Sequence, residues 1–212
     1  MVWSRGLLLA LSLAPALEAQ AQRSAPEEVE AAEEARARSY FTDTELLDQD
    51  GRPVRFFSDA VKGRVVCLSF VFSRCSGACP LLAQKLNRVR QDLGDRFGRD
   101  VFFVSISVDP GFDTPQQLRR FAERQQALHP GWTFLTGTRA AVQTVLTKLG
   151  AWVEEPGDHS TAFIAGNART RHWTKVRPDL PPGAVAEILR QLADEAPPAE
   201  KPVSAATPSA PR

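Results

Sequence analysis

The feature that most constrains this chain is a buried-strand pattern that runs almost directly into two cysteines. Residues 65–72 are mostly apolar or β-branched, which is typical of a central strand buried on both faces of a sheet. Cys75 and Cys79 follow at CxxxC spacing, and Pro80 opens a stretch whose apolar residues recur at helical spacing. The sequence therefore predicts a strand that leads into a helix, with two thiols at the junction.

The expected place of the two thiols indicates that they are reactive. Pro80 is expected at the first helical position, which places Cys79 near the N-cap. Free backbone N–H groups and the positive end of the helix dipole favour a thiolate there, and Arg74 favours a thiolate at Cys75. Cys67 lies inside the apolar run instead, so we expect it to be a small buried core residue.

A second apolar run, residues 101–108, follows the predicted helix. Two such strands on either side of a helix form a βαβ unit with parallel strands. We therefore expect an α/β fold with a central mixed sheet flanked by helices and an N-terminal hairpin. The other expected elements are a hairpin over 46–56 that turns at Asp50-Gly51, a helix after Thr114-Pro115, a strand at 132–135, a helix capped by Thr138, a closing hairpin over 160–176 that turns at Gly166-Asn167, and a helix after Pro181-Pro182-Gly183.

The two ends of the chain differ in composition from its middle. Residues 1–21 combine a basic residue, an apolar stretch and a small-x-small ending, which indicates a secretory signal peptide; an uncleaved membrane anchor is the alternative. We expect residues 22–39 to form a solvated linker or a marginal helix, residues 40–194 the folded domain, and residues 195–212 a disordered tail. The domain is thus expected to be exported, either periplasmic or anchored in the membrane facing the periplasm.

Composition also narrows the classes of function. A formal net charge of +1 with few basic clusters argues against a nucleic-acid partner. Export would place all three cysteines in an oxidising compartment. Because Met1 is the only methionine, a soft-metal site in the mature chain would have to use thiolate and imidazole ligands.

The predicted order of elements, with two thiols at the end of the first buried strand, resembles the thioredoxin-like fold. The spacing here is CxxxC, whereas the generic redox proteins of that fold carry CxxC. Over about residues 40–192 the chain is similar to the Sco/SenC family of copper chaperones. The resemblance rests on the motifs FSRCSGACP at 72–80, SISVDPGFDTP at 105–115, WTFLTG at 132–137 and DHS at 158–160.

This resemblance implies that Cys75, Cys79 and His159 bind copper, as Cu(I) or alternatively as Cu(II). Cu(I) is a soft ion that accepts few ligands, which two sulfurs and a neutral imidazole satisfy. The resemblance also implies that Asp109 and Asp113 lie near the metal or contact a partner; the alternative is that they end a strand and stabilise a turn. The implied recipient is a cytochrome c oxidase subunit, at whose copper centre the chaperone acts, or another copper carrier.

The alternative function is that of a thiol–disulfide oxidoreductase. Cys75 would attack a partner's disulfide, and Cys79 would resolve the mixed disulfide. A peroxiredoxin is disfavoured because the pattern PxxxTxxC is absent around both cysteines, and zinc is disfavoured because no fourth ligand is apparent. We expect His129 and His172 to be surface residues without a role in the site.

Overall fold

The computed structural model describes residues 30–196. The chain divides after Tyr40 into two compact units, and the second unit carries the sheet and every predicted site residue. Residues 30–41 are helical, so the described part of the predicted linker forms a helix. The predicted signal peptide and most of the predicted tail lie outside the described residues. Among the described residues, no helix has the length and apolar character needed to span a bilayer.

A seven-stranded mixed sheet forms the centre of the second unit, with the strand order β2-β1-β5-β4-β3-β6-β7. The neighbours β3, β4 and β5 are parallel, and all other pairs are antiparallel. This arrangement confirms the expected α/β class and the N-terminal hairpin. The strands are β1 (Glu45–Asp48), β2 (Pro53–Arg55), β3 (Val65–Val71), β4 (Val101–Ser107), β5 (Trp132–Thr136), β6 (Phe163–Asn167) and β7 (His172–Val176).

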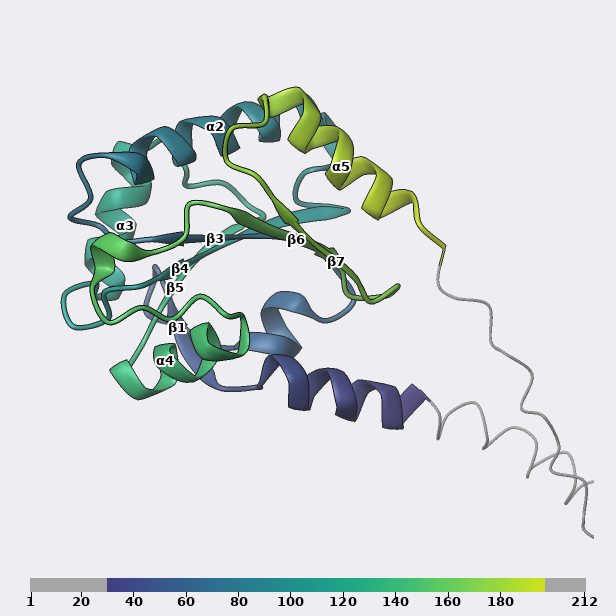
Figure 1. Ribbon diagram of the computed structural model, residues 1–212, viewed down its shortest axis with the longest axis horizontal. Coiled ribbons are helices and arrows are strands. Elements are labelled where there is room, and N and C mark those ends of the chain that lie inside the picture. Colours follow the sequence, from purple (N-terminus) through teal and green to yellow (C-terminus); the bar gives the residue numbers. More distant parts are fainter. Residues whose placement is uncertain (1–29, 197–212) are drawn as a thin grey trace, which may run out of the picture. The chain divides into compact units, whose positions relative to one another are not determined.

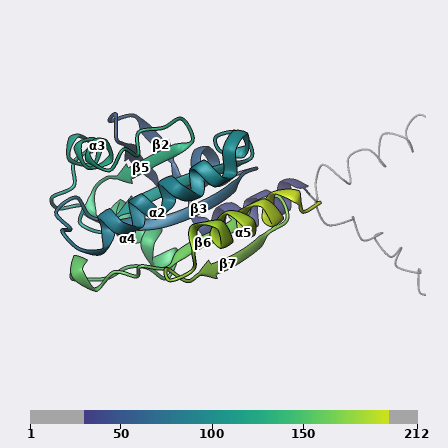
Figure 2. The same cartoon turned by 90° about the horizontal axis from the view of Figure 1, so that it is seen from above.

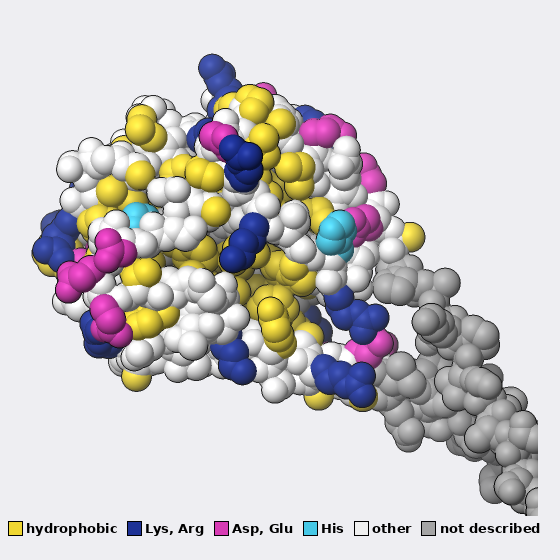
Figure 3. All heavy atoms as spheres, viewed as in Figure 1, with side chains coloured by type: hydrophobic (Ala, Val, Ile, Leu, Met, Phe, Trp, Pro, Cys, Tyr) yellow, Lys and Arg dark blue, Asp and Glu magenta, His cyan; other side chains and the backbone are white. Residues whose placement is uncertain are grey.

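Helices cover both faces of the sheet (Figure 1). One face is covered by α2 and α5, which lie side by side over β3 and β6 in the view from above (Figure 2), and α4 lies on the other face. The helical segments are η1 (Phe56–Val61, a π-helix), α2 (Ala78–Leu93), η2 (Gly94–Arg96), α3 (Pro115–Arg124), α4 (Arg139–Lys148), η3 (Pro156–Asp158) and α5 (Pro182–Asp194). On the face drawn in Figure 3, the described cationic and anionic side chains are interspersed.

The central strand β3 is buried over its whole length because helices pack on both of its faces. Alternate side chains from Val65 through Cys67 to Val71 join the core beneath α2 and α5. Cys67 is fully buried there, as expected. The parallel register pairs Val71 with Ser107, so β3 and β4 end at the same edge of the sheet. The loops after both strands therefore meet at that edge, where the cysteines are found.

Two local predictions were wrong. Helix α2 begins at Ala78 after an N-cap at Gly77, so Cys79 is the second helical residue and Pro80 the third. The closing hairpin turns after Asn167, since Gly166 lies within β6 opposite Trp173. A Cβ atom added to Gly166 would lie 2.2 Å from a ring carbon of Trp173. The glycine makes room for the indole, and this close packing is why a dipeptide that resembles a turn continues the strand.

Candidate metal centre

Cys75 and Cys79 occupy the loop that joins β3 to α2 and the first turn of that helix. The backbone N–H of Cys75 donates to the Phe72 carbonyl at 3.1 Å, which closes a tight turn after the strand. The backbone N–H of Cys79 donates to Cys75 Sγ at 3.4 Å. The side chain of Cys75 is partly exposed, whereas Cys79 is fully buried. The two free thiols therefore differ in access to solvent although they lie one turn apart.

The two thiols also differ in acidity. Burial would raise the pKa of Cys75, but hydrogen bonds from Cys79 and from the backbone N–H groups of Gly77 and Ala78 together lower it. Burial raises the pKa of Cys79, and the neighbouring sulfur of Cys75 raises it further. The predicted thiolate at Cys79 is therefore wrong: the backbone N–H groups at the start of the helix lower the pKa of Cys75 instead. Because Cys79 is buried beside the Cys75 sulfur, its thiol is the less acidic of the pair.

His159 brings an imidazole ring to the same place from a distant part of the chain. It follows the short η3 turn and precedes β6, and it is buried, with 8% of its surface exposed. The Nε2 atom lies 3.7 Å from Cys79 Sγ. The ring meets Phe72 edge-on at 5.4 Å between centroids, so an aromatic side chain fixes its orientation.

A hydrogen bond at the other nitrogen fixes the tautomer of His159. Nδ1 lies 2.9 Å from the Pro156 carbonyl oxygen, which can only accept, so Nδ1 carries the proton. Nε2 then has a free lone pair directed at Cys79. Burial lowers the pKa of His159, and the bond to Pro156 opposes this only in part, so the ring is neutral at neutral pH. A neutral imidazole held by a backbone carbonyl is the form that ligates metal ions.

The residues fit a soft metal ion, but they are not yet gathered around one point. Among residues 30–196, no three His, Cys, Asp or Glu side chains are close enough together to hold a metal ion. The pair Cys79 and His159 is in place, and the sulfur of Cys75 accepts from the backbone N–H of Cys79 and interacts with the Cys79 thiol.

Asp113 supports the cysteine loop through Ser73, and its charge raises the pKa of Cys79. Its buried carboxylate accepts hydrogen bonds from the backbone N–H of Ser73 at 3.1 Å, from Ser73 Oγ at 2.5 Å and from Ser107 Oγ at 2.6 Å. Burial raises the pKa of Asp113 although these hydrogen bonds favour the charged form. The carboxylate thus ties the residue two positions before Cys75 to the end of β4.

Asp109 supports the same loop from its outer side. Its carboxylate pairs with the guanidinium of Arg74 at 2.5 Å, and the guanidinium stacks on the Phe112 ring at 4.5 Å from its centroid. Asp109 therefore contacts the residue directly before Cys75, and Asp113 contacts the residue before that. Both aspartates also shape the 109–113 turn, where the N–H of Asp113 donates to the Asp109 carbonyl at 2.8 Å. A place near the metal or at a partner contact, and a role in stabilising the turn, are therefore compatible for Asp109 and Asp113.

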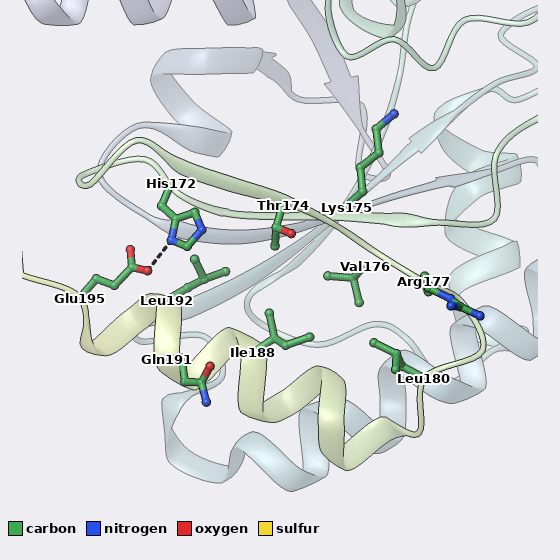
Figure 4. Close-up of a pocket in the computed structure, with 10 residues that line it drawn as sticks. All are labelled: His172, Thr174, Lys175, Val176, Arg177, Leu180, Ile188, Gln191, Leu192 and Glu195. Atoms are coloured by element: carbon green, nitrogen blue, oxygen red, sulfur yellow. Dashed lines mark hydrogen bonds and ion pairs between the residues drawn. The ribbon is translucent and has the colours of Figure 1, made fainter.

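Other candidates lie away from this cluster. The Nε2 atom of His129 is 3.0 Å from the Gln126 carbonyl oxygen, and the Nδ1 atom of His172 is 2.5 Å from a carboxylate oxygen of Glu195. A cavity of about 310 Å³ lies between β7 and α5, with His172 and Glu195 at one end and Leu180 towards the other (Figure 4). None of its lining residues is a predicted site residue, so this cavity is separate from the cysteines.

Sequence reasoning missed the supporting residues of the site. Phe72, Ser73 and Ser107 were seen only as parts of motifs, and the carbonyl of Pro156 carried no signal. A polar residue directly after a buried strand, opposite a second strand that ends in serine, could have pointed to Ser73 and Ser107. The backbone contact of Pro156 could not have been read from residue types.

The fold and the site together define a thioredoxin-like protein with a dithiol at the end of its central strand and a histidine beside it. The chain belongs to the SCO1/SenC family, whose model matches residues 31–194. The family assignment made from the sequence motifs is therefore confirmed.

Individual relatives agree with this family. The chain is 34% identical over 90 residues to the SCO1 protein homolog of Bacillus subtilis. This aligned segment is 42% of this chain and 45% of the length of that relative. The structure of Bradyrhizobium japonicum ScoI with copper bound matches 70% of this chain and 96% of its own, with a TM-score of 0.60 and 22% identity. BsSco is described as a member of the Sco family of cytochrome c oxidase assembly proteins with a disulfide switch. Its structure matches 71% of this chain and 91% of its own, with a TM-score of 0.59 and 23% identity.

Proposed function

We propose that this protein is an exported copper carrier that binds Cu(I) through Cys75, Cys79 and His159. The single observation that carries the proposal is the approach of His159 Nε2 to within 3.7 Å of Cys79 Sγ. Nδ1 carries the proton that bonds to the Pro156 carbonyl, so Nε2 is unprotonated. The lone pair of His159 faces the thiol of Cys79 beside the ring of Phe72, and an imidazole nitrogen and a thiolate are suitable ligands for a soft ion.

Delivery of copper requires that the ion can leave. Cys79 and His159 are buried, but the side chain of Cys75 is partly exposed. A partner's ligand can therefore replace Cys75 first, while the buried pair retains the ion. Copper is the cargo in this scheme, and the chain supplies one accessible and two sheltered ligands.

The family relation supports the identity of cargo and recipient. ScoI of Bradyrhizobium japonicum has been solved with copper bound, and BsSco is described as a member of a family of cytochrome c oxidase assembly proteins. By this relation, we propose that the recipient is the copper centre of a respiratory oxidase or another copper carrier. Both would meet the domain in the periplasm, to which the predicted signal peptide or anchor would direct it.

An anaerobic Cu(I) titration of the reduced protein against a competing chelator tests the ligand set. The wild type is expected to bind one equivalent tightly, and Cys75→Ser, Cys79→Ser and His159→Ala are each expected to weaken binding by about tenfold or more. The matched control is His129→Ala, which removes a partly exposed histidine bonded to a backbone carbonyl elsewhere. Full-strength binding of one equivalent by His159→Ala would contradict the three-ligand model.

The contrast between the two thiols supports thiol–disulfide exchange as a second function. The acidic, partly exposed Cys75 is suited to attack a partner's disulfide as a thiolate, with release of one partner thiolate. Cys79 would then lose its proton, attack Cys75 Sγ and release the second partner thiolate. His159→Ala separates the two functions, because it should weaken copper binding by about tenfold or more and leave the rate of exchange largely unchanged.

A further inference from the structure

Two exposed apolar side chains stand beside the cysteine loop. Large hydrophobic side chains that are exposed are few among residues 30–196: Leu81 is 66% exposed, Phe112 is 38% exposed, and the third, Tyr40, belongs to the first unit. Within the second unit, therefore, both such residues belong to the segments that surround Cys75. Apolar side chains gathered at a functional site are typical of a surface that another protein covers.

Leu81 approaches the loop from the helix side. It lies in the first turn of α2, on the solvent side opposite the buried residues Cys79 and Leu82. Side chains of an α-helix point back toward its N-terminus, so Leu81 covers the turn that contains Gly77 and Ala78. The N–H groups of Gly77 and Ala78 in this turn bond to Cys75, so the leucine and the partly exposed thiol share the same turn.

Phe112 approaches from the other side, on the turn between β4 and α3. Its ring lies under the guanidinium of Arg74, which is adjacent in sequence to Cys75 and is joined to Asp109. This stacking orders both side chains although they are partly exposed. The aromatic ring and the cation thus form a fixed rim beside the cysteine.

We propose that Leu81, Phe112 and Arg74 form a docking surface for the partner protein that exchanges ligands or thiols with Cys75. The proposal rests on the proposed function and adds the chemistry of the partner: an accessible cysteine flanked by an apolar side chain and a carboxylate. The apolar side chain would cover Leu81 and Phe112, as a central contact does in protein interfaces.

The carboxylate follows from the charge of Arg74. Its side chain is 56% exposed, and its bonds to Asp109 use only Nε and Nη2 of a group with five N–H donors. A second cation, Arg124, lies against the same loop, with Nη2 3.4 Å from the Ser73 carbonyl oxygen. A partner with an acidic residue beside its cysteine therefore meets complementary charge, and one with a basic residue meets repulsion.

The exchange of the reduced protein with model peptides tests the surface without copper. The probes are short peptides whose single cysteine carries a 2-thiopyridyl group, flanked by leucine and aspartate, by leucine and lysine, or by glycines. The Cys75 thiolate bonds to the peptide sulfur, the bond to the pyridyl sulfur breaks, and pyridine-2-thiolate leaves with the electron pair and takes up a proton. Its absorbance gives the rate, and 2,2′-dithiodipyridine reports the intrinsic reactivity of the thiol.

We expect the leucine–aspartate peptide to react about fivefold faster than the glycine peptide and faster than the leucine–lysine peptide at low salt. Leu81→Ser and Phe112→Ser should each remove most of the advantage over glycine and leave the rate with 2,2′-dithiodipyridine unchanged. Ile188→Ser, at the separate cavity between β7 and α5, is the control and should retain the preference. Circular dichroism confirms that each variant is folded.

Equal rates with the leucine and glycine peptides, or equal loss of preference in Ile188→Ser, would overturn the docking surface. Equal rates with the aspartate and lysine peptides would overturn the assignment of an acidic partner. Neither result depends on copper, so failure of this inference is distinguishable from failure of the ligand set, which the Cu(I) titration tests separately.

Discussion

Ser73 and Asp113 lie forty positions apart, and the hydroxyl of Ser73 donates a 2.5 Å hydrogen bond to the Asp113 carboxylate. The backbone N–H of Ser73 donates to the same oxygen at 3.1 Å. These bonds join the two motifs that characterise the chain, the cysteine loop and the turn after β4. The geometry of Cys75 therefore depends on a carboxylate that has no contact with the cysteine itself.

Removal of the Asp113 carboxylate should destabilise the domain and weaken metal binding. Asp113→Ala leaves the donors of Ser73 without a partner in a buried place, which should cost about 3 kcal/mol of unfolding free energy. Asp113→Asn keeps an acceptor for Ser73, and the Ser107 hydroxyl can rotate to accept from the amide, so it should cost much less. Urea unfolding measures both, and equal losses in the two variants would contradict the hydrogen-bond explanation.

The stability difference between the wild type and Asp113→Asn should depend on pH. Burial raises the pKa of Asp113 above its ordinary value of 3.8, so the folded state holds this proton more tightly than the unfolded state. The contribution of Asp113 to stability is therefore greatest at acid pH and declines as the pH rises from 3.8 through the higher folded pKa. The stability advantage of the wild type over Asp113→Asn should accordingly shrink from about pH 4 to neutrality. An advantage that grows over this range would contradict the assignment.

Alkylation should distinguish the three thiols. The hydrogen bonds that lower the pKa of Cys75 predict that iodoacetamide modifies it with a pH midpoint below the ordinary 9.0. Burial raises the pKa of Cys79, and it raises that of Cys67 to about 12, so both should react slowly in the folded protein. Peptide mapping by mass spectrometry identifies the modified residue. First modification at Cys79, or an unchanged fast phase in Cys75→Ser, would show that the acidic thiol is misassigned.

Local signals in the sequence were sufficient for most elements of the fold. Thr114 and Thr138 cap their helices through side-chain oxygens, as expected from a threonine before a helical pattern. Gly166 misled the prediction because its role comes from Trp173 on the neighbouring strand, and a contact across a sheet leaves no local trace.

The site was less accessible to sequence reasoning than the fold. The two thiols could be located from the pattern alone, but the place of His159 was inferred only from the family resemblance. The bond between Ser73 and Asp113 depends on the register that pairs Val71 with Ser107, and this register is set by packing over both strands. Side chains that meet at the ends of strands therefore require the tertiary structure.

Gly166 offers a test of packing at the hairpin behind the site. A Cβ atom at this position would lie 2.2 Å from Trp173, so Gly166→Ala should lower the unfolding free energy by about 2 kcal/mol. Gly157→Ala is the matched control, because a Cβ atom there meets no heavy atom within 4 Å, and its effect should be within about 0.5 kcal/mol. Chemical denaturation of both variants provides the measurement. A larger loss in Gly157→Ala than in Gly166→Ala would refute the close approach of the indole.

His159 should make the stability of the metal-free protein depend on pH. Burial lowers its pKa below the ordinary 6.5, so the unfolded state binds this proton more readily than the folded state. The contribution of the neutral ring is fully present above pH 6.5 and is lost as the pH falls through 6.5 toward the lower folded pKa. In urea unfolding of the metal-free protein between about pH 8 and 5, the wild type should therefore lose more stability than His159→Ala. His129→Ala keeps the buried ring of His159 and should follow the wild type. Parallel curves for the wild type and His159→Ala would show that burial does not hold the His159 ring neutral.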